Sequence, residues 1–98
     1  MRDIFYSNQF EKDLRKIKAY KGFNKDKLKA YVNKIANGEP LPPAAKQHKL
    51  APSSPKKYKG MFDFHIAADI CVVYEITDTS VNLFRIGKHN NLGLTENI

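Results

Sequence analysis

The chain has 98 residues, which is enough for one small domain, and its 42% hydrophobic content excludes wholesale disorder. Seventeen Lys and Arg against ten Asp and Glu give a formal net charge of +7, which favours a polyanionic partner, nucleic acid ahead of an anionic membrane surface. No apolar run reaches the length of a membrane span and no apolar leader follows Met1, so we expect no membrane partner and a cytoplasmic protein.

The chain begins with a predicted short strand and a helix. Residues 4–6 are apolar and bounded by polar residues, as in a strand at the edge of a sheet. Ser7 or Asn8 can cap the helix, and Glu11 stands in capping-box position after Asn8. Gly22 is the expected end of the helix. One apolar stripe at helical spacing defines its buried face: Phe10, Leu14 and Ile17.

A second helix is predicted directly after the first. It begins near Asn24 or Asp26, ends at Gly38, and cannot continue through Pro40. Its expected buried face consists of Leu28, Tyr31, Val32 and Ile35. The two helices form an antiparallel hairpin, because few residues join them. The lysines on their outer faces are either a solvated surface or a surface that follows phosphates.

The C-terminal half predicts three or four antiparallel strands. Residues 46–50 are short and strand-like, residues 62–66 alternate in polarity, and residues 81–86 form the last strand. Residues 70–76 are almost wholly apolar and β-branched, as in a strand buried on both faces. We therefore predict an α+β fold in which a helical hairpin packs on an antiparallel sheet, as a single domain over residues 1–98.

Polar side chains interrupt this strand pattern. Asp63 and His65 share one face of their strand, opposite the aromatic and aliphatic residues. A hairpin after this strand brings His65 and Asp69 together at its tip. In the last strand, Arg85 and His89 project to the same side if the extended backbone continues. The strand ends are therefore where we expect the chemistry.

The chain has three histidines, one at or near the end of each of three predicted strands: His48, His65 and His89. Histidine suits general acid–base catalysis because both of its protonation states exist near neutral pH. Cleavage of RNA by its own 2′-hydroxyl needs a base for that hydroxyl, an acid for the departing 5′ oxygen, and a cation near the phosphorus. The histidines with Asp69, Arg85 and nearby lysines supply these roles.

A basic group with an aromatic residue precedes the first long strand. It consists of Lys56, Lys57, Tyr58 and Lys59. Such a group can bind a phosphate and stack a base, and it is equally compatible with a solvated turn.

The histidines and the aspartate have two alternatives to a catalytic role. Each histidine can be a surface residue without a role. A metal site of three histidines and one aspartate is conceivable, but the ligands lack the short local spacing of familiar zinc motifs. Cys71 is the only cysteine and lies inside an apolar strand, which predicts a buried, inert thiol.

A set of short motifs occurs in a fixed order along the chain. They are Arg2-Asp3-Ile4-x-Tyr6-Ser7-x-Gln9-Phe10-x-Lys12-Asp13, Leu41-Pro42-Pro43, His48-x-Leu50, Tyr58-Lys59-Gly60, Asp63-x-His65, Asp69-Ile70-x-Val72-Val73-Tyr74 and Arg85-x-Gly87-x-His89. As an ordered set they resemble the YafQ branch of the RelE-like toxins of bacterial toxin–antitoxin pairs, over nearly the whole chain. The resemblance implies a helical hairpin on an antiparallel sheet, in agreement with the predicted elements. The expected order of elements along the chain is β-α-α-β-β-β, with a possible extra short strand.

The resemblance also implies a function. Toxins of this family are ribosome-dependent endoribonucleases that cut mRNA in the decoding site. An antitoxin encoded beside the toxin neutralises it, and the pair represses its own operator. The expected partners are therefore a cognate antitoxin, the ribosome with mRNA, and operator DNA through the antitoxin complex, with no cofactor and no metal.

The active-site positions of the family fall on four residues of this chain: His48, His65, Asp69 and His89. Asp63 and Arg85 match neighbouring positions of that site. His89 is the expected general acid, and His65 and His48 are candidates for the base, with Asp69 orienting or sharing that role. We place Arg85, Asp63, Lys56, Lys57, Lys59 and Tyr58 in substrate binding.

The chain departs from the family in four places, one of which is a longer loop between His48 and Tyr58. It has Ile70 where related toxins often carry Trp, Ala67-Ala68 where Glu-Pro is common, and Leu92-Gly93-Leu94 where an aromatic residue usually ends the chain. Loss of that aromatic weakens base stacking. The competing hypothesis is a non-catalytic member of the same fold that inhibits a protein target or only binds nucleic acid.

Overall fold

The computed structural model describes residues 1–50, 58, 60–88 and 92. The chain order of the elements in these residues is β1 (Asp3–Tyr6), α1 (Asn8–Ile17), α2 (Lys25–Ala36), the short 3-10 helix η1 (Pro43–Ala45), β2 (His48–Lys49), β3 (Phe62–Ala67), β4 (Ile70–Ile76) and β5 (Ser80–Lys88). The predicted order of two helices followed by strands is confirmed, and β2 is the extra short strand. No helix in the described part of the chain is long and apolar enough to cross a membrane.

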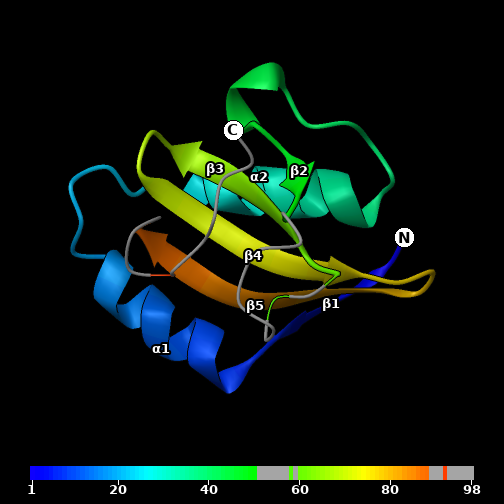
Figure 1. The fold of residues 1–98 in the computed structure, drawn as a ribbon, viewed down its shortest axis with the longest axis horizontal. Helices are drawn as coiled ribbons and strands as arrows, with labels where there is room; N and C mark the ends of the chain where they lie inside the picture. The colour runs from blue at the N-terminus through cyan, green and yellow to red at the C-terminus, as the bar shows by residue number, and fades with distance from the viewer. Residues whose placement is uncertain (51–57, 59, 89–91, 93–98) are drawn as a thin grey trace.

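The strands form one five-stranded sheet in the order β1-β5-β4-β3-β2 (Figure 1). The pairs β2–β3, β3–β4 and β4–β5 are antiparallel, whereas β1 runs parallel to β5. The sheet is therefore mixed, and the prediction of a purely antiparallel sheet is wrong for β1. A tight hairpin forces antiparallel pairing, but two helices and three strands separate β1 from β5 and leave the direction of their pairing open.

The start of α1 differs by one residue from the predicted capping box. Ser7 is the N-cap, and its hydroxyl oxygen accepts a hydrogen bond of 2.9 Å from the Phe10 amide. Glu11 therefore lies one position beyond the place that a capping box requires, so its pairing with Asn8 is wrong. Ser7 also donates from its hydroxyl to the Phe84 carbonyl at 2.8 Å, which ties the start of the helix to β5.

The other helix ends follow local sequence signals with one exception. α1 ends at Ile17, where its apolar stripe ends, and a turn follows in which the Tyr20 amide donates to the Ile17 carbonyl at 2.9 Å. The predicted end at Gly22 is therefore too late. Asn24 caps α2 by accepting a 3.0 Å hydrogen bond from an amide of its first turn, and Gly38, with φ of 74°, follows its last residues. Both signals were expected.

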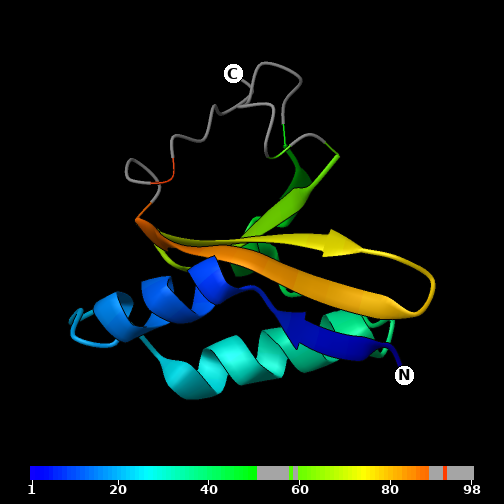
Figure 2. The ribbon, with the colours of Figure 1, turned by 90° about the horizontal axis from the view of Figure 1, so that it is seen from below.

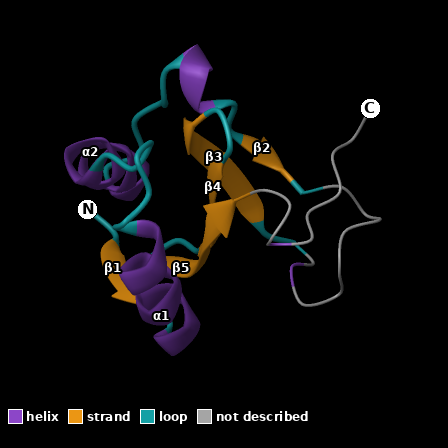
Figure 3. Cartoon of the chain, turned by 90° about the vertical axis from the view of Figure 1, so that its left-hand side faces the viewer, coloured by secondary structure: helices purple, strands orange, loops and turns teal. Residues whose placement is uncertain are grey.

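The sheet has an apolar layer on each face. Both helices cover one face, and the main core lies between them and the strands (Figures 2 and 3). The predicted alternation in β3 is confirmed, since Phe64 and Ile66 point into this core while Asp63 lies on the opposite face. A smaller cluster on that opposite face consists of Leu50, Tyr58, Cys71, Val73 and Leu92. β4 is therefore buried on both faces, as predicted.

α1 also protects the edge of β5. β1 pairs only with residues 80–83 of β5, so the backbone of the following residues needs other partners. Asp13 in α1 supplies one, because its carboxylate accepts a 3.2 Å hydrogen bond from the Ile86 amide. This contact places an acidic side chain of α1 beside Arg85.

Candidate active site

One row of residues crosses the sheet on the face opposite the helices. The pairs His48–Asp63, Asp63–Val73 and Val73–Arg85 are in register across β2, β3, β4 and β5. Cross-strand partners point to the same face, and neighbouring strands lie about 4.8 Å apart, so the backbones of His48 and Arg85 are separated by roughly 14 Å. A row of this width brings an imidazole, a carboxylate and a guanidinium to one surface.

Asp63 is the centre of this row. Its carboxylate is fully buried, and it lies between two imidazoles. Its Oδ1 is 3.0 Å from Nδ1 of His48, and its Oδ2 is 3.8 Å from Nε2 of His65. A buried carboxylate needs positive or hydrogen-bonding partners to offset its lost hydration, and the two imidazoles lie where such partners are needed.

His48 is the accessible member of the group. Its side chain is 38% exposed, against 8% for His65. Nδ1 of His48 lies 3.0 Å from the Asp63 carboxylate and 2.8 Å from the Lys46 carbonyl, and both are acceptors. Nδ1 must therefore carry the hydrogen, which leaves the lone pair of neutral His48 on Nε2. The site thus holds one solvent-accessible imidazole in the tautomer of a general base.

His65 faces a thiol as well as a carboxylate. Cys71 is its cross-strand partner in β4, and its Sγ lies 3.4 Å from Nε2 and 3.7 Å from Nδ1 of His65. The predicted burial of Cys71 is confirmed at 0% exposure. Its position beside His65 was not predicted, because it depends on the register of the β3–β4 hairpin.

Arg85 is fixed from the side of α1. Its Nε donates to Oδ2 of Asp13 at 2.6 Å and its Nη2 donates to Oδ1 at 3.2 Å, while Gln9 donates to the same Oδ1 at 3.0 Å. Burial alone raises the pKa of Asp13, but the hydrogen bonds from Arg85, Gln9 and the Ile86 amide outweigh it and lower the pKa below 3.8. The hydrogen bond to Asp13 raises the pKa of Arg85, so both groups are charged at neutral pH.

Tyr74 follows Val73 in β4 and points to the opposite face of the sheet, into the core that the helices cover. Its hydroxyl accepts a 2.6 Å hydrogen bond from the Gln47 side-chain amide. Burial raises the pKa of the Tyr74 phenol, the Gln47 hydrogen bond lowers it, and the negative charge of Asp63 raises it again. The net shift is upward, so Tyr74 remains a neutral hydroxyl group at physiological pH.

The structure places only part of the predicted site in one group. His48, Asp63 and His65 come together, and Arg85 shares their row. Asp69 is exposed in the turn between β3 and β4, outside the buried group that contains His65. The residues His89, Lys56, Lys57 and Lys59 lie outside the described residues.

Tyr58 has a different role from the one expected. Its ring is fully buried, it packs edge-on against Phe84 with 5.9 Å between ring centroids, and its hydroxyl donates to the Leu92 carbonyl at 2.9 Å. A ring with no exposed face cannot stack a base, so stacking by Tyr58 is wrong for this structure. The basic residues around it in sequence suggested exposure, but its apolar ring completes the small core on this face.

Sequence analysis also missed Asp13. The signal was present, because Asp13 stands three residues after Phe10 and four before Ile17, within the apolar stripe of α1. A carboxylate in such a stripe must find a partner when the helix packs. The partner, Arg85, was identified separately, but nothing in the sequence links the two.

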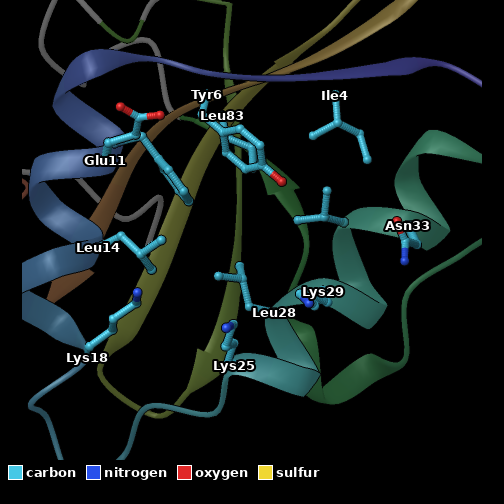
Figure 4. A pocket seen from close by; sticks show the side chains of 12 residues that line it. Ile4, Tyr6, Glu11, Leu14, Lys18, Lys25, Leu28, Lys29, Asn33 and Leu83 are labelled. Atoms are coloured by element: carbon cyan, nitrogen blue, oxygen red, sulfur yellow. The ribbon is translucent and has the colours of Figure 1, made fainter.

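An apolar groove lies on the other side of the molecule, on the face that the helices cover. It has a volume of about 500 Å³ and runs between α1, α2 and β1 (Figure 4). Its walls are apolar, with Ile4, Leu14, Leu28 and Leu83 among them, and three lysines stand along it: Lys18, Lys25 and Lys29. We call this the helix groove. The sheet separates it from His48 and His65.

Comparisons with known proteins agree over nearly the whole chain. Residues 2–93 match a family described as a bacterial toxin of type II toxin–antitoxin system, YafQ. The mRNA interferase toxin YafQ of Escherichia coli is 38% identical over 90 residues, covering 90% of this chain and 91% of the relative.

Two solved structures illustrate the likeness in fold. A chain of the E. coli DinJ–YafQ toxin–antitoxin complex superposes with a TM-score of 0.76 at 34% identity, covering 93% of this chain and 96% of that chain. A copper-bound mutant toxin from Helicobacter pylori superposes with a TM-score of 0.82 at 28% identity, covering 94% and 99%.

Proposed function

The chain belongs to the YafQ family of bacterial toxins of type II toxin–antitoxin systems, and on that premise we propose that it is an mRNA interferase. It acts as an endoribonuclease that cuts mRNA on the ribosome and so inhibits translation. The observation that supports this most directly is the His48–Asp63 pair, in which a buried carboxylate holds an accessible imidazole at 3.0 Å.

The proposed reaction begins at the 2′-hydroxyl of the nucleotide before the cut. Neutral His48 accepts the hydroxyl proton on Nε2, and the 2′ oxygen attacks the adjacent phosphorus. The imidazolium that forms is stabilised by the negative charge of Asp63, whose Oδ1 lies 3.0 Å from Nδ1, while the Lys46 carbonyl accepts the Nδ1 hydrogen. The bond from phosphorus to the 5′ oxygen then breaks, and His89 protonates that oxygen as general acid. The products are a 2′,3′-cyclic phosphate and a free 5′-hydroxyl.

Arg85 is proposed to stabilise the negative charge that develops at the phosphate. A guanidinium has five N–H groups, and Asp13 engages Nε and one N–H of Nη2, so further groups can donate to a phosphate oxygen. Its position is fixed before substrate binds, which reduces the reorganisation that the transition state requires. His65 supports Asp63 from the buried side, and Asp69 stays a predicted member of the site at the hairpin tip.

The ribosome and its mRNA are the proposed substrate assembly. The net charge of +7 favours association with RNA, and Lys56, Lys57 and Lys59 are the proposed phosphate contacts. A cytoplasmic location follows from this substrate.

A cognate antitoxin is the proposed protein partner. The YafQ relative is seen in complex with the antitoxin DinJ. In this chain, the helix groove offers an apolar floor and a rim that contains Lys18, Lys25 and Lys29, which suits an amphipathic segment with acidic residues on its flanks. We propose that the antitoxin of this chain occupies the groove, and that operator DNA is bound only through the resulting complex.

Single-turnover cleavage of an mRNA positioned on ribosomes tests the catalytic proposal. Loss of a positioned acid or base costs about 10²–10⁴-fold in rate, so His48→Ala and His89→Ala should both cleave slowly and still bind ribosomes. Lys49→Ala, next to His48 and exposed, is the matched control and should cleave at the parent rate. A parent chain that binds ribosomes but leaves the mRNA intact would favour the non-catalytic alternative.

A further inference from the structure

We infer that Asp63, His65 and Cys71 form a binding site for a divalent transition-metal ion of the zinc type. The three side chains lie on the adjacent strands β3 and β4 and are buried, with 0%, 7% and 0% exposure. One ligand atom from each of them lies within 4.8 Å of the other two. We call this group the Asp–His–Cys cluster. The proposed cleavage reaction makes no use of Cys71.

The distances between the donor atoms suit one tetrahedral ion. Bond lengths of about 2.0–2.3 Å to nitrogen, oxygen and sulfur place the ligand atoms of such an ion about 3.4–3.6 Å apart. In the cluster, Nε2 of His65 lies 3.4 Å from Sγ of Cys71 and 3.8 Å from Oδ2 of Asp63. Two edges of the coordination tetrahedron are therefore already formed to within a few tenths of an ångström.

The charges of the donors also match the ion. An ionised carboxylate and a thiolate carry two negative charges, which balance a doubly charged cation when the imidazole is neutral. A neutral assembly avoids the large cost of an uncompensated charge in a buried site. Thiolate and imidazole donors favour zinc-type ions over magnesium or calcium, which prefer oxygen ligands.

The surroundings of the cluster orient one of its ligands. Oδ1 of Asp63 faces Nδ1 of His48 at 3.0 Å, so an ion pair with His48 orients the carboxylate while Oδ2 remains on the side of His65. Partners of this kind hold metal ligands in place and raise affinity. Three protein ligands leave a fourth position for water.

Binding requires two local changes. Sγ of Cys71 lies at similar distances from both ring nitrogens of His65, 3.4 and 3.7 Å, so it does not lie in line with the lone pair of either. The imidazole must turn about its Cβ–Cγ bond to direct Nε2 at an ion. The thiol must also lose its proton, so binding releases a proton and weakens as the pH falls.

A consequence for catalysis rests on the proposed function. An ion on the cluster draws charge from Asp63, and this carboxylate then stabilises the His48 imidazolium less. Cleavage should therefore slow when the site is filled. Because Cys71 takes no part in the proposed reaction, its replacement should remove this inhibition and leave metal-free cleavage unchanged.

Titration of the full chain with Zn²⁺, followed by calorimetry, tests the site directly. We expect one ion per chain and, with Co²⁺ as a probe, a thiolate-to-metal charge-transfer absorption. Cys71→Val keeps an apolar residue in β4 and should weaken Zn²⁺ binding at least 100-fold and abolish the absorption, since even lost outer partners cost about 10–100-fold. Asp69→Asn removes an exposed carboxylate nearby and should bind Zn²⁺ like the parent.

Two results would overturn the inference. One is a parent chain that binds no Zn²⁺ at millimolar concentration, and the other is Cys71→Val that binds as tightly as the parent. Binding and cleavage are measured separately, so the two proposals can fail separately. A chain that binds Zn²⁺ through Cys71 but never cleaves mRNA contradicts only the proposed function.

Discussion

Asp13 and Arg85, 72 positions apart in the sequence, form a two-point ion pair that joins α1 to the last strand. The same carboxylate accepts the Ile86 amide, so one side chain both closes the edge of β5 and fixes a guanidinium at the candidate site. The pair is largely buried, with 7% exposure for Asp13 and 20% for Arg85. The same contact therefore supports both the stability of the fold and the proposed role of Arg85 in catalysis.

Asp13→Asn should lower the free energy of unfolding by about 1.5–3 kcal/mol at pH 7, the usual contribution of a hydrogen bond to a charged group. The difference from the parent should disappear in acid. The pKa of Asp13 is lowered in the folded state, so its stabilisation is present above its ordinary value of 3.8 and is lost as pH falls through the folded value. Urea unfolding of both proteins between pH 7 and pH 2 measures this.

The exposed carboxylate of Asp3 provides the control for this experiment. Asp3→Asn should leave the unfolding free energy within about 0.5 kcal/mol of the parent at each pH. A gap between Asp13→Asn and the parent that stays constant down to pH 2 would show that the ion pair is not what the substitution removes.

Much of the fold follows from local sequence signals. Asn24 and Gly38 mark the ends of α2 because capping and left-handed backbone depend on a few neighbouring residues. The alternation in β3 correctly separates Phe64 from Asp63 because side chains in a strand alternate between faces.

The features that sequence analysis missed depend on contacts between distant segments. The direction of β1 is set by its pairing with β5. The residues around Cys71 are set by the register of the β3–β4 hairpin, whose turn contains no sequence motif that predicts this register. The burial of Tyr58 depends on the small core behind β4, including Leu92. For the same reason the candidate site was predicted as a set of residue types, while its actual pairing, His48 with Asp63, was not.

The proposed phosphate contacts Lys56 and Lys57 give a second prediction. Lys56→Gln and Lys57→Gln should each reduce the slope of log affinity against log salt concentration by about 0.7, because each phosphate contact with single-stranded RNA releases condensed counterions. The single-turnover rate at saturating ribosomes should not change. Filter binding of the toxin to ribosomes at several salt concentrations measures the slope, and a slope that both substitutions leave intact would exclude these lysines as contacts.

The helix groove gives a third prediction. Lys25→Glu with Lys29→Glu should weaken binding of the cognate antitoxin at least tenfold at low salt, because reversed charges repel acidic flanks. Cleavage without antitoxin should be unchanged, since the sheet separates the groove from His48 and Asp63. Lys12→Glu, exposed on α1 and outside the groove lining, is the matched control. Equal antitoxin affinity in all three proteins would place the interface elsewhere.

The last prediction concerns the coupling between His48 and Asp63. An asparagine at position 63 removes the negative charge that lies 3.0 Å from Nδ1 of His48, while the Lys46 carbonyl still accepts the Nδ1 hydrogen. His48 then has no counter-charge when it takes up the 2′-hydroxyl proton, so it no longer serves as an effective base. Asp63→Asn should therefore slow cleavage about 10²–10⁴-fold, as His48→Ala does. Because both changes remove the same base, the double variant should be no slower than His48→Ala alone.

Single-turnover cleavage by the parent, both single variants and the double variant completes this cycle. Asp63 is fully buried, so urea unfolding of each variant must first show a cooperative transition. Among folded variants, losses that multiply would mean that the two residues act independently, and the proposed pair would be wrong. Losses that do not multiply support a single unit, in which the buried carboxylate acts only through the imidazole that it holds.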